Sequence, residues 1–189
     1  MKAALVVFDR MTYLDFVGFY DPITRLKSMN IIPDFEWRIC SNRKQVADDR
    51  GATGMSMLAD SVMEPLGGYD LLYVPGGMGT RTLQHDVEFV DWIRTAAPVK
   101  LKVSVCTGAL LLGAAGFLKG RRATTHPGAL KELAPYCDTV LTDRLTYPGF
   151  KSAAAAAGVR LVGVEADAAG MIPAALEEAC KRHKPKAVY

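Results

Sequence analysis

Short apolar runs rich in Val, Leu, Ile and Ala alternate with helical patterns along this chain of 189 residues. Nearly continuous apolar strands separated by helices are typical of a parallel sheet that is buried on both faces. We therefore expect an α/β fold with three α/β/α layers and a mostly parallel, doubly wound sheet of about seven or eight strands. The expected strands are Ala3–Phe8, Trp37–Cys40, Leu71–Val74, Val103–Val105, Ala123–Thr125, Val140–Thr142, Leu161–Val164 and Ala187–Tyr189.

Helical periodicity fills most of the intervals between these runs. The expected helices are 14–29, 86–96, 107–117, 128–135, 147–157 and 173–183. Two short segments, Gly51–Met57 and Ser61–Met63, instead resemble a hairpin insertion. The length suits one core, so residues 1–189 are expected to form a single domain.

The composition excludes several classes of protein. The chain is 50% hydrophobic, too apolar for disorder, and its net charge of +3 is too small for a dedicated nucleic-acid binder. The four cysteines lie far apart without a C-x-x-C pair, which disfavours a disulfide framework or a zinc site and predicts a reducing, cytoplasmic setting. The first apolar run is too short for a signal peptide, and Val103–Leu118 falls short of a membrane helix of about 20 residues.

The chemistry of a doubly wound sheet is expected at the carboxyl ends of its strands. A cysteine, Cys106, follows one buried strand there, and a helix begins within a residue or two. This resembles a nucleophile elbow, in which the first turn of the helix would stabilise a thiolate and lower the pKa of the thiol. The alternative is a buried cysteine that acts only as a small hydrophobic residue.

Three other features end on the same rim. Gly76 and Gly77 follow the strand Leu71–Val74, and their N–H groups would form an oxyanion hole or bind substrate. The alternative is that the two glycines form an ordinary turn after the strand. Asp15 lies among apolar and aromatic residues that would raise the pKa of its carboxyl and let it move a proton; otherwise it is a helix charge or cap. His126 either pairs with the cysteine or, as we favour, orients the loop before Pro127.

Taken together and in this order, these motifs resemble the PfpI-type superfamily, and within it the isonitrile (isocyanide) hydratase branch. The resemblance covers residues 1 to about 137. It is carried by Tyr13-Leu14-Asp15-Phe16-Val17-Gly18, Tyr73-Val74-Pro75-Gly76-Gly77, Ser104-Val105-Cys106-Thr107-Gly108 and Arg122-Ala123-Thr124-Thr125-His126, and by the run from Leu110 to Leu118.

The resemblance implies a flavodoxin-like fold and a specific chemistry. Cys106 would attack an isocyanide carbon, Asp15 would handle the proton, Thr107 would hydrogen-bond nearby, and water would release an N-substituted formamide. The substrate would be a small molecule, no cofactor would be required, and a homodimer is left open. From the residues themselves we expect no metal site, because no H-x-x-x-H or acid–His cluster is present, and no binding of nucleic acid or membrane. Protease and deglycase relatives usually carry a histidine after the nucleophile and a glutamate on the first helix, where this chain has Thr107 and Asp15.

The segment 138–189 resembles a different family, the large domain of fold-type-I pyridoxal-phosphate aminotransferases and especially their MocR-type branch. It lacks the part of that family that holds the cofactor, including the Schiff-base lysine, so no pyridoxal phosphate is expected. Two resemblances that meet near 135–139 suggest an engineered chimera with weak or lost activity. The alternatives are an active hydratase-like or PfpI-type cysteine hydrolase and a ligand-sensing regulator module.

Overall fold

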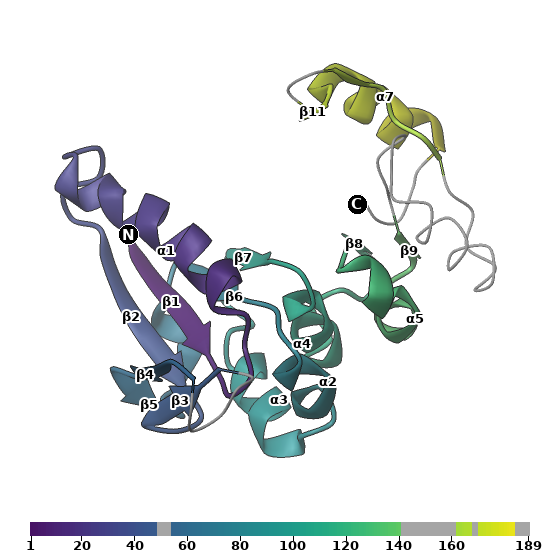
Figure 1. Ribbon diagram of the computed structural model, residues 1–189. Coiled ribbons are helices and arrows are strands. Elements are labelled where there is room, and N and C mark those ends of the chain that lie inside the picture. The colour runs from purple at the N-terminus through teal and green to yellow at the C-terminus, as the bar shows by residue number, and fades with distance from the viewer. Residues whose placement is uncertain (49–53, 141–161, 168–169, 184–189) are drawn as a thin grey trace. The chain divides into compact units, whose positions relative to one another are not determined.

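The central feature of the fold is a parallel sheet of five strands in the order β5-β2-β1-β6-β7 (Figure 1). The computed structural model describes residues 1–48, 54–140, 162–167 and 170–183. The sheet is built from β1 (Lys2–Val7), β2 (Glu36–Ser41), β5 (Ser61–Val62), β6 (Leu71–Val74) and β7 (Leu101–Ser104). Every neighbouring pair in it is parallel, which confirms the predicted class of fold.

The middle strands of this sheet are covered on both faces. Ala3–Val7 of β1 and all four residues of β6 are buried, as expected for apolar strands between helical layers. The helices of this part are α1 (Tyr13–Ser28), α2 (Gly79–Leu83), α3 (Val87–Arg94) and α4 (Gly108–Ala114). The sequence did not indicate α2, because five residues are too few to show a helical period. Within the described ranges, no helix is long and apolar enough to cross a membrane.

The predicted hairpin insertion has different partners from those expected. An antiparallel hairpin does form, but between β3 (Gln45–Ala47) and β4 (Ser56–Leu58). Ser61–Val62 instead extends the main sheet beside β2, so its predicted pairing with the preceding segment is wrong. The carboxylate of Asp60 accepts a hydrogen bond of 2.8 Å from the backbone N–H of Ile39, which holds the chain against β2 at this point.

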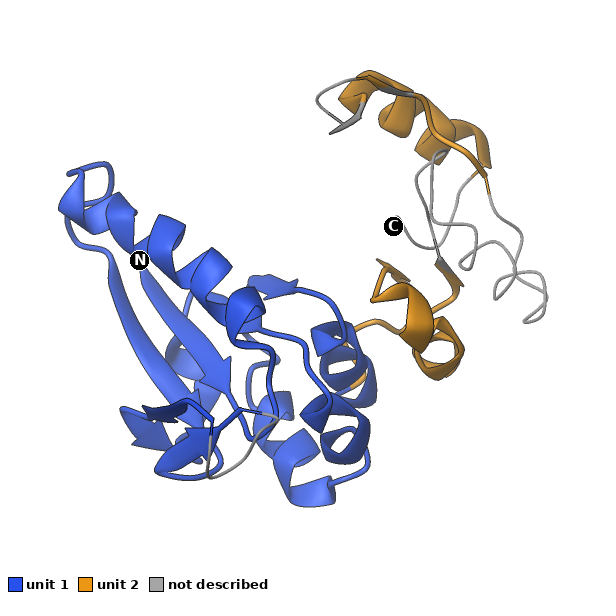
Figure 2. Cartoon of the chain, in the orientation of Figure 1, with its two compact units in different colours: residues 1–115 blue, residues 116–189 orange. Residues whose placement is uncertain are grey.

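The described chain separates into two compact units, Met1–Ala115 and Gly116–Tyr189 (Figure 2). In the second unit, β8 (Arg122–Ala123) pairs in parallel with β9 (Thr139–Val140), and β10 (Ala166–Asp167) pairs with β11 (Gly170–Met171). Strands expected after residue 120 therefore pair with one another. In the described part of the chain the main sheet consequently has five strands, fewer than predicted.

The helices of the second unit agree with the sequence in part. Helix α7 spans Pro173–His183, as predicted. The helix expected over 128–135 is broken into a 3-10 turn, the short α5 (Leu130–Leu133) and a second 3-10 turn that contains Pro135, which cannot donate a helical hydrogen bond. No strand is formed by residues 162–164, so that prediction is wrong for them. The expected elements at 147–157 and 187–189 lie outside the described residues.

Candidate active site at the ends of strands β6 and β7

Cys106 lies in the tight turn between β7 and α4, with a backbone φ of +51°. This left-handed conformation is uncommon for any residue other than glycine, and such strain is concentrated at functional sites. The turn is closed on both sides, because the N–H of Val105 donates to the carbonyl of Val74 and the N–H of Gly108 donates to that of Val105. Cys106 is only partly buried.

Gly76 is the point where the other predicted site residues meet. Its N–H donates a hydrogen bond of 3.1 Å to Oδ2 of Asp15. A Cβ atom at this position would lie 2.6 Å from Cβ of Cys106, 2.7 Å from Oδ2 of Asp15 and 2.7 Å from the backbone nitrogen of Thr107. Contacts below 3.0 Å are not tolerated, so only glycine allows these three groups to approach one another. The structure therefore brings Asp15, Gly76, Cys106 and Thr107 together.

Gly77 is joined to Thr107 by two hydrogen bonds. The N–H of Gly77 donates to the hydroxyl oxygen of Thr107 over 2.9 Å, and that hydroxyl lies 3.1 Å from the carbonyl oxygen of Gly77, to which it donates. The N–H groups of Gly76 and Gly77 are thus already engaged within the protein. In this structure they do not form the expected oxyanion hole, and Thr107 has the role of fixing the loop after β6 against the turn after β7.

The electrostatic environment of Cys106 raises the pKa of its thiol. Burial is the largest cause, and the hydrogen-bonded carboxyl of Asp15 raises it further. The backbone N–H and the hydroxyl of Thr107 act in the opposite direction but do not prevail. The expectation of a lowered pKa is therefore wrong in direction. A thiolate at this position would lie in a half-buried site beside a carboxyl group, and both features disfavour the charged form.

The sequence did not identify Tyr73 as a site residue, although its side chain contacts Asp15. Its hydroxyl donates a hydrogen bond of 2.5 Å to the backbone carbonyl oxygen of Asp15. The ring is fully buried and stacks on Phe19, with 3.9 Å between ring centroids and 2° between planes. The available signal was a phenol hydroxyl in a strand that is otherwise wholly apolar, because a buried hydroxyl needs a partner.

His126 is exposed and belongs to the second unit. Its Nδ1 accepts a hydrogen bond of 3.1 Å from the N–H of Gly128 and so caps the 3-10 turn that begins at Pro127. This is the loop-orienting role that we favoured over a Cys–His pair.

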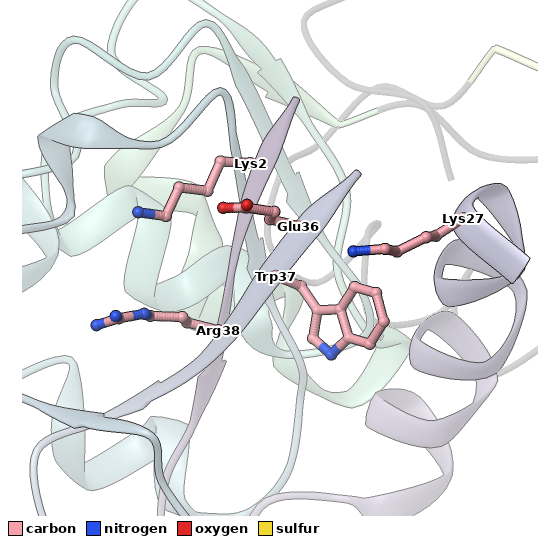
Figure 3. A pocket seen from close by; sticks show the side chains of 5 residues that line it. All are labelled: Lys2, Lys27, Glu36, Trp37 and Arg38. Atoms are coloured by element: carbon pink, nitrogen blue, oxygen red, sulfur yellow. The ribbon is translucent and has the colours of Figure 1, made fainter. Parts of the chain in front are cut away.

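A separate hollow of about 300 Å³ lies at the other end of the strands (Figure 3). It is lined by Lys2, Lys27, Glu36, Trp37 and Arg38. Figure 3 shows Lys2, Glu36 and Arg38 on one side of the strands and Lys27 with Trp37 on the other, as alternation along β2 requires. Arg38 also lies 3.5 Å from Glu64. The cations therefore do not converge on one point, and we assign no chemistry to this hollow.

Comparisons with known proteins agree with the geometry. The profile of the DJ-1/PfpI family matches residues 1–156. An isonitrile hydratase from Pseudomonas putida is 32% identical over 191 residues, which cover 95% of this chain and 79% of that protein. The solved structure of oxidized DJ-1 from Toxoplasma gondii is similar in fold, with a TM-score of 0.56 and 22% identity over 69% of this chain and 70% of that one.

One comparison points to another class of protein. An aromatic amino acid aminotransferase from Schizosaccharomyces pombe is 47% identical over 49 residues. The matched stretch covers 26% of this chain but only 10% of the aminotransferase. A similarity of this extent does not show that the chain belongs to that class of protein.

Proposed function

The chain belongs to the DJ-1/PfpI family, and we propose that it is a cysteine-dependent enzyme that hydrates isocyanides to N-substituted formamides. The observation that carries this proposal is the close approach of Asp15, Gly76, Cys106 and Thr107 at the ends of β6 and β7. A nucleophile and a proton carrier in direct contact are what the addition of a thiol to a triply bonded carbon requires. The identity to an isonitrile hydratase supports the choice of substrate.

The first proposed step forms a bond between Sγ of Cys106 and the terminal carbon of the isocyanide. The proton that leaves the thiol passes to Asp15 and from there to the same carbon, which gives a thioimidate bound to the enzyme. Because the pKa of Cys106 is raised, the thiol form prevails at neutral pH. The attack therefore needs a base within hydrogen-bond reach, and Asp15 meets this requirement.

The second proposed step adds water to the carbon–nitrogen double bond of the thioimidate. The water oxygen bonds to the carbon, one water proton goes to the nitrogen, and the other returns to sulfur as the carbon–sulfur bond breaks. The product is an N-substituted formamide and the thiol is restored. Water is the only co-reactant, and no electrons are gained or lost overall.

The test is to incubate the whole chain with cyclohexyl isocyanide and to follow N-cyclohexylformamide by mass spectrometry. We expect repeated turnover that is lost in Cys106→Ser. Hydrolysis of a peptide or ester substrate without formamide would favour the PfpI-type hydrolase instead. Isocyanide binding with no product, measured by calorimetry, would favour a ligand-sensing module.

A second proposal concerns the segment 138–189, and it holds that this segment has a different origin and that turnover is slow for this reason. The similarity to an aminotransferase over 49 residues, close to the length of this segment, supports it. Against it, the similarity to the hydratase covers 95% of the chain and so extends past residue 138, and the family profile reaches residue 156. A natural sequence with high identity on both sides of residue 138 would contradict a chimera. Turnover in the ordinary range of about 1–1000 per second would contradict the weak activity.

A further inference from the structure

Two contacts hold Asp15, and both come from the same short stretch of chain. The hydroxyl of Tyr73 donates to the backbone carbonyl of Asp15 over 2.5 Å, and the N–H of Gly76 donates to its carboxylate over 3.1 Å. Tyr73 lies within β6 and Gly76 in the loop that follows it. The first turn of α1 is thereby tied to the end of β6 at a backbone atom and at a side-chain atom of one residue.

Tyr73 is itself held firmly. It pairs with Leu5 of β1 on one side and with Val103 of β7 on the other, and its side chain has no exposed surface. Its ring stacks on Phe19, which follows Asp15 by four residues and so lies on the same face of α1. A hydroxyl on such a fixed ring can define the position of the helix turn that it contacts.

We propose that Tyr73 is a positioning residue, which holds Asp15 in register with the thiol of Cys106. The inference rests on the proposed function only for the role of Asp15 in turnover. Asp15 and Cys106 both lie close to Gly76, and the carboxyl raises the pKa of the thiol, whatever the substrate is. A third hydrogen bond, from the N–H of Thr12 to the carbonyl of Gly76 over 2.8 Å, holds the start of α1 but does not involve Asp15. If the hydroxyl of Tyr73 is removed, Asp15 itself loses one of its two hydrogen bonds to this stretch, and its carboxyl moves away from sulfur for part of the time.

The test compares Tyr73→Phe with the wild type by alkylation of Cys106 with iodoacetamide as a function of pH, read by mass spectrometry of the Cys106 peptide. Asp15 raises the pKa of the thiol, so a displaced Asp15 lowers the midpoint of the alkylation profile. We expect a shift of roughly 0.5 pH unit, a fraction of the effect of a charge at contact distance. Turnover should fall about tenfold in the same variant, because small misplacements of catalytic groups are costly.

The matched control is Tyr69→Phe. Tyr69 is also a tyrosine whose pKa is raised by burial, but its hydroxyl contacts the thiol of Cys40 at 3.7 Å and not Asp15. Its removal should leave the midpoint for Cys106 unchanged. A shift of equal size in Tyr69→Phe would show that loosening of the core alone moves the midpoint, and it would overturn the inference.

The decisive arm is a double-mutant cycle with Asp15→Asn. If Tyr73 acts through Asp15, Tyr73→Phe has no further effect on the midpoint once the carboxylate is gone. An unchanged midpoint in Tyr73→Phe alone, or a shift that persists in the Asp15→Asn background, would contradict the inference. If the isocyanide is not turned over by the wild type but these shifts are found, only the proposed function fails.

A second variant guards against a failure of Tyr73→Phe to fold. Phe19→Leu keeps the hydroxyl of Tyr73 but removes the ring on which it stacks. It should lower the midpoint in the same direction by a smaller amount, and again only when Asp15 is present. Thermal unfolding of each variant confirms that the folded state is being compared. A Phe19→Leu midpoint equal to that of the wild type would count against the positioning role.

Discussion

Cys40 and Cys106 offer a comparison between two regions of one sheet, each with a cysteine near a tyrosine. Cys40 lies within β2 in regular strand geometry, has no exposed surface, and contacts the hydroxyl of Tyr69. Cys106 lies beyond the end of β7, with a positive φ, and is partly exposed. In both cases burial is the largest cause of a raised pKa.

The difference between the two regions shows that a raised pKa does not identify a reactive thiol. What distinguishes Cys106 is geometry: a strained turn that presents sulfur at the rim of the sheet, and a glycine that lets Asp15 approach it. Cys40 instead lies inside the sheet, where it pairs with Val6 of β1 and Ser61 of β5, and it has no exposed surface. We therefore expect reactivity to depend on position relative to the strand end. Four tests, with seven substitutions in all, address this comparison.

The largest effect on turnover is expected from the first test, which replaces each of the two cysteines separately. Cys106→Ser should lower isocyanide turnover by roughly a thousandfold or more, because it removes the nucleophile. Cys40→Ala should leave turnover unchanged and lower the free energy of unfolding by about 1 kcal/mol, from lost burial. Product formation and chemical denaturation measure the two quantities. A loss of turnover in Cys40→Ala would remove the distinction between the regions.

A second test places the same methyl group at two glycines. Gly76→Ala should reduce turnover by about a hundredfold, because its Cβ would collide with Cys106, Asp15 and Thr107 and displace them. Gly18→Ala is the control, since no atom lies within 4 Å of a Cβ there and alanine favours a helix by about 1 kcal/mol. It should keep full turnover and unfold at a higher denaturant concentration. Equal turnover in the two variants would contradict the assigned convergence at Gly76.

A third test uses the opposite effects of Thr107 and Asp15 on the pKa of Cys106. Thr107→Val removes a hydroxyl that lowers the pKa, so the alkylation midpoint should move to higher pH and the rate at pH 8 should fall by about threefold. Asp15→Asn removes a group that raises the pKa, so the midpoint should move to lower pH by about 1 unit. Iodoacetamide labelling against pH measures both. Shifts of the same sign would refute the electrostatic account.

The smallest effect is expected at His126. His126→Ala removes the acceptor for the N–H of Gly128 and should cost about 0.5 kcal/mol, because this exposed turn can bind water instead. Neither the alkylation of Cys106 nor turnover should change. A large loss of turnover without loss of stability would restore the Cys–His pair that we disfavoured.

Much of the first unit could be predicted from the sequence, because its signals are local. The apolar run of β6 and the periodicity of α1 are read from neighbouring residues, and both were placed within a residue. The short α2 was missed, and β4 was assigned the wrong hairpin partner, because α2, β3 and β4 are too short to show a period. In the second unit, Pro135 lies at the end of the helix that periodicity predicted over 128–135, where the chain forms a 3-10 turn.

The sequence by itself determined which residues stand at the strand ends, because strand, turn and helix are encoded over a few residues. It thus placed Cys106 at an elbow and Gly76 in a loop on the same rim. Only the tertiary structure decided what meets there: Asp15 reaches Gly76 across 61 positions, and Tyr73 reaches Asp15 across 58. The tertiary structure also decided that the pKa of Cys106 is raised, because the shift depends on burial and on the carboxyl of Asp15, which is distant in the sequence.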